Sequence, residues 1–133
     1  MQLISALFDA PVPAGMALTA LAQEGAAPAD LGVWPPLPAI PVPPPAAQLL
    51  AEAADLAGAL RLLAQLGLPA EGLAQAQEGL ARGAILVMAR APDLSAAALV
   101  KRLAECSPLG PEAALAWARD GALRYRWSEL GQG

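Results

Sequence analysis

The stretch LGLPAEGLAQAQEGLARGAILVMARA, residues 66–91, decides the fold that the sequence predicts. It begins with a tight turn at Gly67. Pro69 then opens a helix, because a proline in the first helical turn lacks only an amide hydrogen that has no partner there. Two glycines flank the end of this helix, and residues 84–89 follow as one of the two most apolar runs of the chain. Such a run is typical of a strand that is buried on both faces of a sheet.

The segment before this stretch predicts a strand, a helix and a second strand. Residues 3–8 are continuously apolar and predict the first strand. Pro13 is suited to open a helix and Gly25 to stop it in a left-handed conformation. Residues 30–34 predict a shorter and less apolar strand. The helix has apolar residues at the spacing of one buried face, namely Ala14, Ala17, Leu18 and Leu21.

A proline-rich segment, residues 35–45, separates the second strand from the next helix. Most of its positions lack an amide donor, so it can form neither a helix nor a central strand. It is either a docking site for a partner with an aromatic groove or a stiff connector packed on the domain, and we favour the connector.

Residues 46–67 predict a long amphipathic helix, because apolar residues recur there at helical spacing. Leu62 and Leu66 add apolar groups on the opposite side of this helix. A helix that is apolar all round is usually buried all round. Either the short helix that follows or a second subunit therefore covers that side.

After the apolar strand, Asp93 is a plausible cap for a helix that contains Cys106. A short helix over residues 111–118 and an alternating edge strand over residues 123–127 complete the chain. We therefore predict one α+β domain over residues 1–133.

The predicted architecture is a ferredoxin-like βαββαβ sandwich, with the proline-rich connector and a two-helix insertion, residues 46–82, between the second and third strands. In this arrangement the first and third strands lie at the centre of the sheet. They are also the two most apolar strands of the chain.

Several short motifs resemble the general stress protein 17M-like (heat-induced stress protein) family. Leu7-Phe8-Asp9 ends the first strand and Asp30-Leu31-Gly32-Val33 forms the second. Leu66-Gly67-Leu68-Pro69 and Glu78-Gly79-Leu80-Ala81-Arg82-Gly83 are similar to that family's turn and helix end. The chain departs from the family pattern at Ala76, where a tyrosine is usual, in the proline-rich middle and in the extra C-terminal helix. The resemblance implies a small stress-associated bacterial protein and specifies no molecular activity.

The composition excludes several classes of partner. The net charge is −4, with only 8 lysines and arginines, so the chain lacks the basic surface that nucleic acids and anionic membranes require. The single cysteine cannot form an internal disulfide, and the N-terminus lacks a basic signal-peptide region. We therefore expect a cytoplasmic protein without a transmembrane helix.

The residues that carry most enzyme chemistry are scarce. The sequence contains no histidine, which removes histidine bases, Ser–His and Cys–His pairs and most zinc sites. Cys106 is expected to be a buried structural thiol, and Asp9 and Asp30 to be turn or capping residues. Arg90, Arg124 and Arg126 are expected to protect a sheet edge. We expect no catalytic residue, cofactor or metal.

The low charged fraction, 15% against ~25% in an average domain, indicates that another subunit covers some apolar surface. We predict a homodimer that works through protein contacts, with Trp34, Leu62, Leu66 and Trp127 at the interface. The alternative is a sensor that binds a small metabolite between paired ferredoxin-like domains, by analogy at the level of the fold.

Overall fold

A four-stranded antiparallel sheet in the order β2-β3-β1-β4 forms the centre of the computed structural model. The strands are β1 (Gln2–Phe8), β2 (Leu31–Trp34), β3 (Ile85–Ala91) and β4 (Trp127–Glu129). The helices are α1 (Pro11–Gln23), a 3₁₀ turn (Pro28–Asp30), α2 (Leu56–Leu66) and α3 (Ala70–Ala81). The structure describes residues 2–8, 10–37, 46–68, 70–91, 98–99, 101–102 and 127–129. The protein has an α+β fold.

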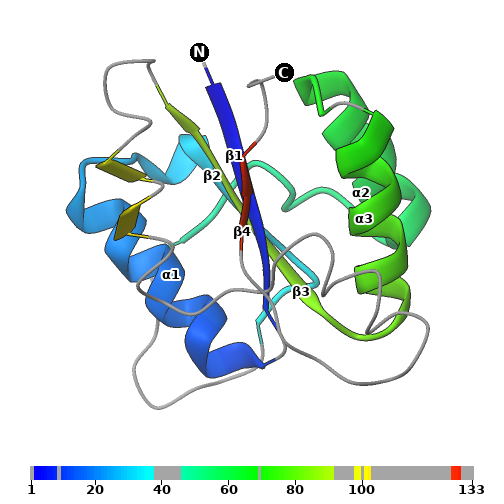
Figure 1. The fold of residues 1–133 in the computed structure, drawn as a ribbon, viewed down its shortest axis with the longest axis horizontal. Helices are drawn as coiled ribbons and strands as arrows, with labels where there is room; N and C mark the ends of the chain where they lie inside the picture. Colours follow the sequence, from blue (N-terminus) through cyan, green and yellow to red (C-terminus); the bar gives the residue numbers. More distant parts are fainter. Residues whose placement is uncertain are drawn as a thin grey trace.

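The two apolar strands, β1 and β3, pair along their whole length, from Gln2 with Ala91 to Phe8 with Ile85. They occupy the two central positions of the sheet, as their composition predicts. Helix α1 covers one face of the sheet, and α2 and α3 cover the opposite face (Figure 1). Because side chains alternate along a strand, each central strand contributes to two separate apolar cores.

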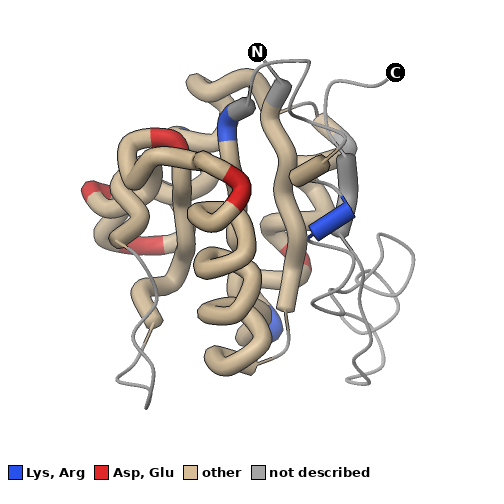
Figure 2. The backbone as a smooth tube through the Cα atoms, turned by 90° about the vertical axis from the view of Figure 1, so that its left-hand side faces the viewer, with Lys and Arg blue, Asp and Glu red and all other residues tan. Residues whose placement is uncertain are grey.

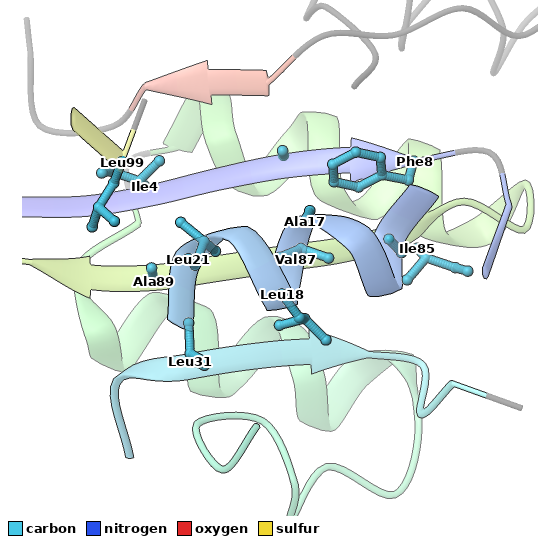
Figure 3. Packing of buried hydrophobic residues seen from close by; sticks show 12 residues of the cluster. Ile4, Phe8, Ala17, Leu18, Leu21, Leu31, Ile85, Val87, Ala89 and Leu99 are labelled. Carbon is cyan, nitrogen blue, oxygen red and sulfur yellow. The ribbon is translucent and has the colours of Figure 1, made fainter. Parts of the chain in front are cut away.

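The first core lies between the sheet and α1 (Figure 3). Phe8 from β1 and Val87 from β3 are almost fully buried against small residues of α1 such as Ala17. Leu99 also belongs to this core, so the helical residues 98–99 lie on the same face of the sheet as α1. The other members are Ile4, Ala6, Ala14, Leu18, Leu21, Leu31, Ile85 and Ala89.

The second core lies between the sheet and the α2–α3 hairpin. Leu63 of α2 is fully buried in it. Gly67 ends α2 with a left-handed φ of 104°, a conformation that glycine adopts without steric cost. Gly79 lets α3 approach the sheet closely, since a Cβ at this position would lie 2.8 Å from Leu7 Cδ1. The remaining buried members are Leu3, Leu7, Leu50, Leu68, Ala76, Leu80, Ala84, Leu86 and Met88.

The helix predicted over residues 46–67 is wrong in its first half, because α2 begins only at Leu56. The Asp55 carboxylate accepts a hydrogen bond from the Gly58 amide at 2.8 Å and caps the helix there. The preceding residues instead run beside β2, where the Leu49 amide donates to the Leu31 carbonyl at 2.8 Å. Leu50 enters the second core from this non-helical segment.

Other element boundaries differ by a few residues. Helix α1 begins at Pro11 instead of Pro13, because both prolines fall in the first turn, where amide hydrogens have no helical partner. Strand β2 begins at Leu31 because Asp30 belongs to the 3₁₀ turn. Strand β4 spans Trp127–Glu129 and pairs with β1. The predictions for residues 38–45, 111–118 and 123–126 lie outside the described residues.

Candidate functional site

Trp34, the first of the predicted interface residues, is half-buried at the end of β2. Its indole Nε1 donates a hydrogen bond to the Ala53 carbonyl at 3.2 Å. Its ring packs against the core between the sheet and the α2–α3 hairpin. A tryptophan with its polar atom bonded and its ring in contact with the core is largely committed to its own chain.

Leu62 and Leu66 are also half-buried, and they pack against the same core. The sequence left open whether the following helix or a second subunit covers Leu62 and Leu66. The protein's own chain provides at least part of this cover. The reason is that α2 contacts both the core and its hairpin partner α3. These contacts reduce the apolar surface that Leu62 and Leu66 offer to a second subunit.

Trp127 lies in β4, and its side chain lies outside the described residues. The strand order places the backbones of Trp127 and Trp34 on opposite edge strands of the sheet. Three strand spacings of about 4.8 Å each, roughly 14 Å in all, separate these strands. The two tryptophan positions therefore lie at opposite edges of the sheet.

The strand ends next to Asp9 and Asp30, the two residues expected to be turn or capping residues, lie at opposite ends of the sheet. Phe8, which precedes Asp9, pairs with Ile85, whereas Leu31, which follows Asp30, pairs with Ala89. This register separates the two strand ends by roughly 13 Å along β3. Asp9 itself lies outside the described residues. A carboxylate pair that shares one cleft is therefore not supported by the register.

Asp30 forms an ion pair with Arg90, whose Nη2 lies 3.2 Å from Asp30 Oδ1. Arg90 Nε donates to the same oxygen at 3.3 Å, and both side chains are about one-third exposed. An ion pair this exposed to water contributes little to stability, about 0–1 kcal/mol. It joins the start of β2 to the end of β3. Arg124 and Arg126, the other arginines expected to protect a sheet edge, lie outside the described residues.

The glycines of residues 79–83 end a helix, as predicted, and do not form a phosphate loop. Gly83 has a left-handed φ of 96°, and the Ala84 amide donates to the Gly79 carbonyl at 2.9 Å. This is the hydrogen-bond pattern of a helix end that turns into a strand.

Other chemistry has no assembled site in the part of the chain that the structure describes. These residues contain no cluster of three or more histidine, cysteine, aspartate or glutamate side chains that could hold a metal. Cys106 lies outside them. No helix in the described ranges combines the length and the apolar character needed to cross a membrane.

One surface was missed by the sequence analysis, the outer side of α1. Val12 and Met16 are 54% and 58% exposed, the only exposed large hydrophobic side chains among the described residues. Helix α1 itself contains no charged residue, and Figure 2 shows it in tan along its length. At its C-terminal end, however, Arg102 donates to Gln23 and pairs with Glu24. The signal was present in the spacing of Val12, Met16, Thr19 and Gln23, which lie opposite the buried stripe of the same helix.

Comparisons with known proteins give no further identification. No family model, no curated protein and no solved structure matches this chain.

Proposed function

We propose that this chain is a small non-enzymatic module that acts through protein contacts and forms a homodimer. The observation that carries this proposal is the outer side of α1, a helix with no charged residue of its own, where two large hydrophobic side chains, Val12 and Met16, are exposed. Large apolar side chains on a helix without charges are unusual on a surface that faces only water. By contrast, α2 and α3 carry exposed charged side chains, as expected of helices whose outer side faces water.

The proposal extends to the finer fold, a ferredoxin-like sandwich with an insertion. The strand order β2-β3-β1-β4 and its antiparallel pairings support this arrangement. The position of Leu99 in the same core as α1 supports a second helix on that face. In this description, the α2–α3 hairpin is the insertion, and it covers the face of the sheet that the other two helices leave open (Figure 1).

Kinship with the stress protein family is proposed on the quoted motifs alone. Gly67 and Gly83 stand in left-handed turns and Gly79 at a close helix–sheet contact, so each has a structural reason to be glycine. Glycines are therefore expected wherever a chain forms these turns and this close helix–sheet contact. A cytoplasmic location is likewise proposed from the sequence, since one cysteine requires no oxidising compartment.

The proposed function is tested by sedimentation velocity on the full chain over a wide range of concentrations. We expect a reversible shift from monomer to dimer as the concentration rises. A strict monomer at the highest concentration would contradict the proposal.

The second candidate is a sensor that binds a small metabolite between subunits, and Ser5 is the one buried polar side chain among the described residues. Ser5 is only 5% exposed on β1, and none of the hydrogen bonds of the described residues uses its hydroxyl. A binding site usually needs several convergent polar groups, so this candidate is the weaker one. A metabolite screen by thermal shift tests it, and a rise in melting temperature that Ser5→Ala abolishes would support it.

A further inference from the structure

The two methionines that the structure describes, Met16 and Met88, have opposite environments. Met16 lies in the middle of α1 and is 58% exposed, whereas Met88 lies in β3 and is fully buried in the second core. Met1 and Cys106, the other sulfur-containing residues of the chain, lie outside the described residues. One thioether therefore meets water and the other meets only protein.

The Met88 thioether is enclosed by β2 and by the segment that runs beside it. A Cβ placed on Gly32 would lie 2.7 Å from Met88 Cγ and 3.1 Å from Met88 Sδ. The same Cβ would lie 3.1 Å from Leu49 Cβ, so even a methyl group has no room there. Because protein cores are close-packed, a reagent reaches this sulfur only when that part of the core opens.

The Met16 thioether has no such cover among the described residues. Its neighbours one helical turn away on the same side are Val12, which is 54% exposed, and Thr19, whose hydroxyl donates to the Gly15 carbonyl at 3.1 Å. The Arg102–Glu24 ion pair lies at the end of the helix, about two turns from Met16. A peroxide molecule is uncharged, so the net charge of −4 does not keep it from this sulfur.

Oxidation by a peroxide adds one oxygen atom to the thioether. The sulfur attacks one oxygen of hydrogen peroxide, and the S–O bond forms as the O–O bond breaks. The proton of the attacked oxygen passes to the leaving hydroxide, which departs as water. The sulfur is thereby oxidised and the peroxide reduced. The product is a polar sulfoxide, which methionine sulfoxide reductases return to methionine.

We infer that Met16 is the site at which a peroxide oxidises the folded protein, and that its sulfoxide makes the exposed side of α1 more polar without disturbing either core. This inference goes beyond the proposed function and does not depend on a dimer. Val12 is then the large hydrophobic side chain that stays exposed on α1.

The rates of oxidation at the two methionines test the inference. Dilute protein, which the proposed function expects to be monomeric, is treated with hydrogen peroxide, and tandem mass spectrometry measures the sulfoxide at each position. We expect Met16 to react at least about 100-fold faster than Met88, because the open form of a stable core is rare. In urea above the unfolding midpoint the two rates should converge. A Met88 that reacts as fast as Met16 without urea, or a Met16 that stays unmodified, would overturn the inference.

A second measurement tests the change in surface polarity. After treatment with peroxide, the wild type should elute earlier from a hydrophobic interaction column, and its melting temperature should fall by less than about 3 °C, as for a change at the surface. The matched control is Met16→Leu, which keeps the apolar side chain and removes the sulfur. Met1 and Cys106 are present in both chains, so they cannot cause a difference between them. An equal shift in elution for the two chains, or a large loss of stability in the wild type alone, would overturn the inference.

Discussion

The two faces of the sheet are covered in different ways. On one face, α1 packs small side chains such as Ala14 and Ala17 against the strands, has no charged residue of its own and exposes Val12 and Met16. On the other face, the α2–α3 hairpin packs leucines against the strands and exposes charged residues such as Arg61 and Glu78. The hairpin thus presents charged side chains to water, whereas α1 has none of its own. The exposed large hydrophobic side chains among the described residues therefore lie on the face of the sheet opposite the α2–α3 hairpin.

The difference between the two faces depends on the α2–α3 hairpin being part of the cooperative fold and not merely resting on the sheet. Leu63 of α2 and Leu21 of α1 are both fully buried, one in each core. We expect Leu63→Ala and Leu21→Ala each to lower the free energy of unfolding by about 2–5 kcal/mol, because each leaves a cavity. Urea denaturation measures both. A cost below about 1 kcal/mol for Leu63→Ala alone would show that the hairpin contributes little to the fold.

The two cores also differ in polarity, and a pair of substitutions on neighbouring residues of β1 sharpens this difference. Ser5 lies between Leu3 and Leu7, which face the hairpin, whereas Ala6 faces α1. Ala6→Ser introduces a buried hydroxyl and should destabilise the protein by about 1–3 kcal/mol.

Ser5→Ala removes such a hydroxyl and should stabilise it by up to about 1 kcal/mol. Thermal melts compare the two variants. A clear loss of stability in Ser5→Ala would mean that the hydroxyl has a partner, such as an ordered water.

The smallest loss of stability is expected from substitutions just after the C-terminal ends of α1 and α2, which lie on opposite faces of the sheet. Gly25 follows α1 with φ 101° and Gly67 follows α2 with φ 104°, and a Cβ at either position meets no atom within 4 Å. Gly25→Ala and Gly67→Ala should therefore each cost about 1–2 kcal/mol, the backbone cost of a left-handed alanine.

Asparagine at the same positions should cost less, because it tolerates this conformation better. Urea denaturation distinguishes the variants. A cost of Gly67→Ala much above that of Gly25→Ala would indicate that the hairpin turn is more constrained than the end of α1.

The strand order followed from composition, whereas the helix boundaries did not. The apolar runs of β1 and β3 predict their central positions because only central strands are buried along both faces and both edges. The N-terminal extension of α2 was predicted wrongly because Leu49 and Leu50 match a helical spacing by chance. They are apolar because one lies beside β2 and the other fills the second core.

The candidate site was harder to predict for a related reason. Leu62 and Leu66 indicate only that both sides of α2 need cover, and the spacing does not say that α3 and the sheet provide it. The exposure of Val12 and Met16 on α1 was not predicted either, but for a different reason. The spacing of Ala14, Ala17, Leu18 and Leu21 predicts the buried side of α1 correctly. Exposed apolar residues on the other side were not expected, because large apolar side chains are usually assigned to a core.

The hydrogen bonds beside β2 restrict how this protein can associate. The Leu31 carbonyl already accepts from Leu49, and the Pro28 carbonyl just before the strand accepts from Gln48 at 3.0 Å. An open edge strand is a template on which a strand of another molecule can add, extending the sheet toward aggregates or fibres. At the start of β2 the chain occupies this template itself, and an incoming strand would first have to displace it. The chain's own Gln48 and Leu49 therefore hinder the addition of a strand at the start of this edge.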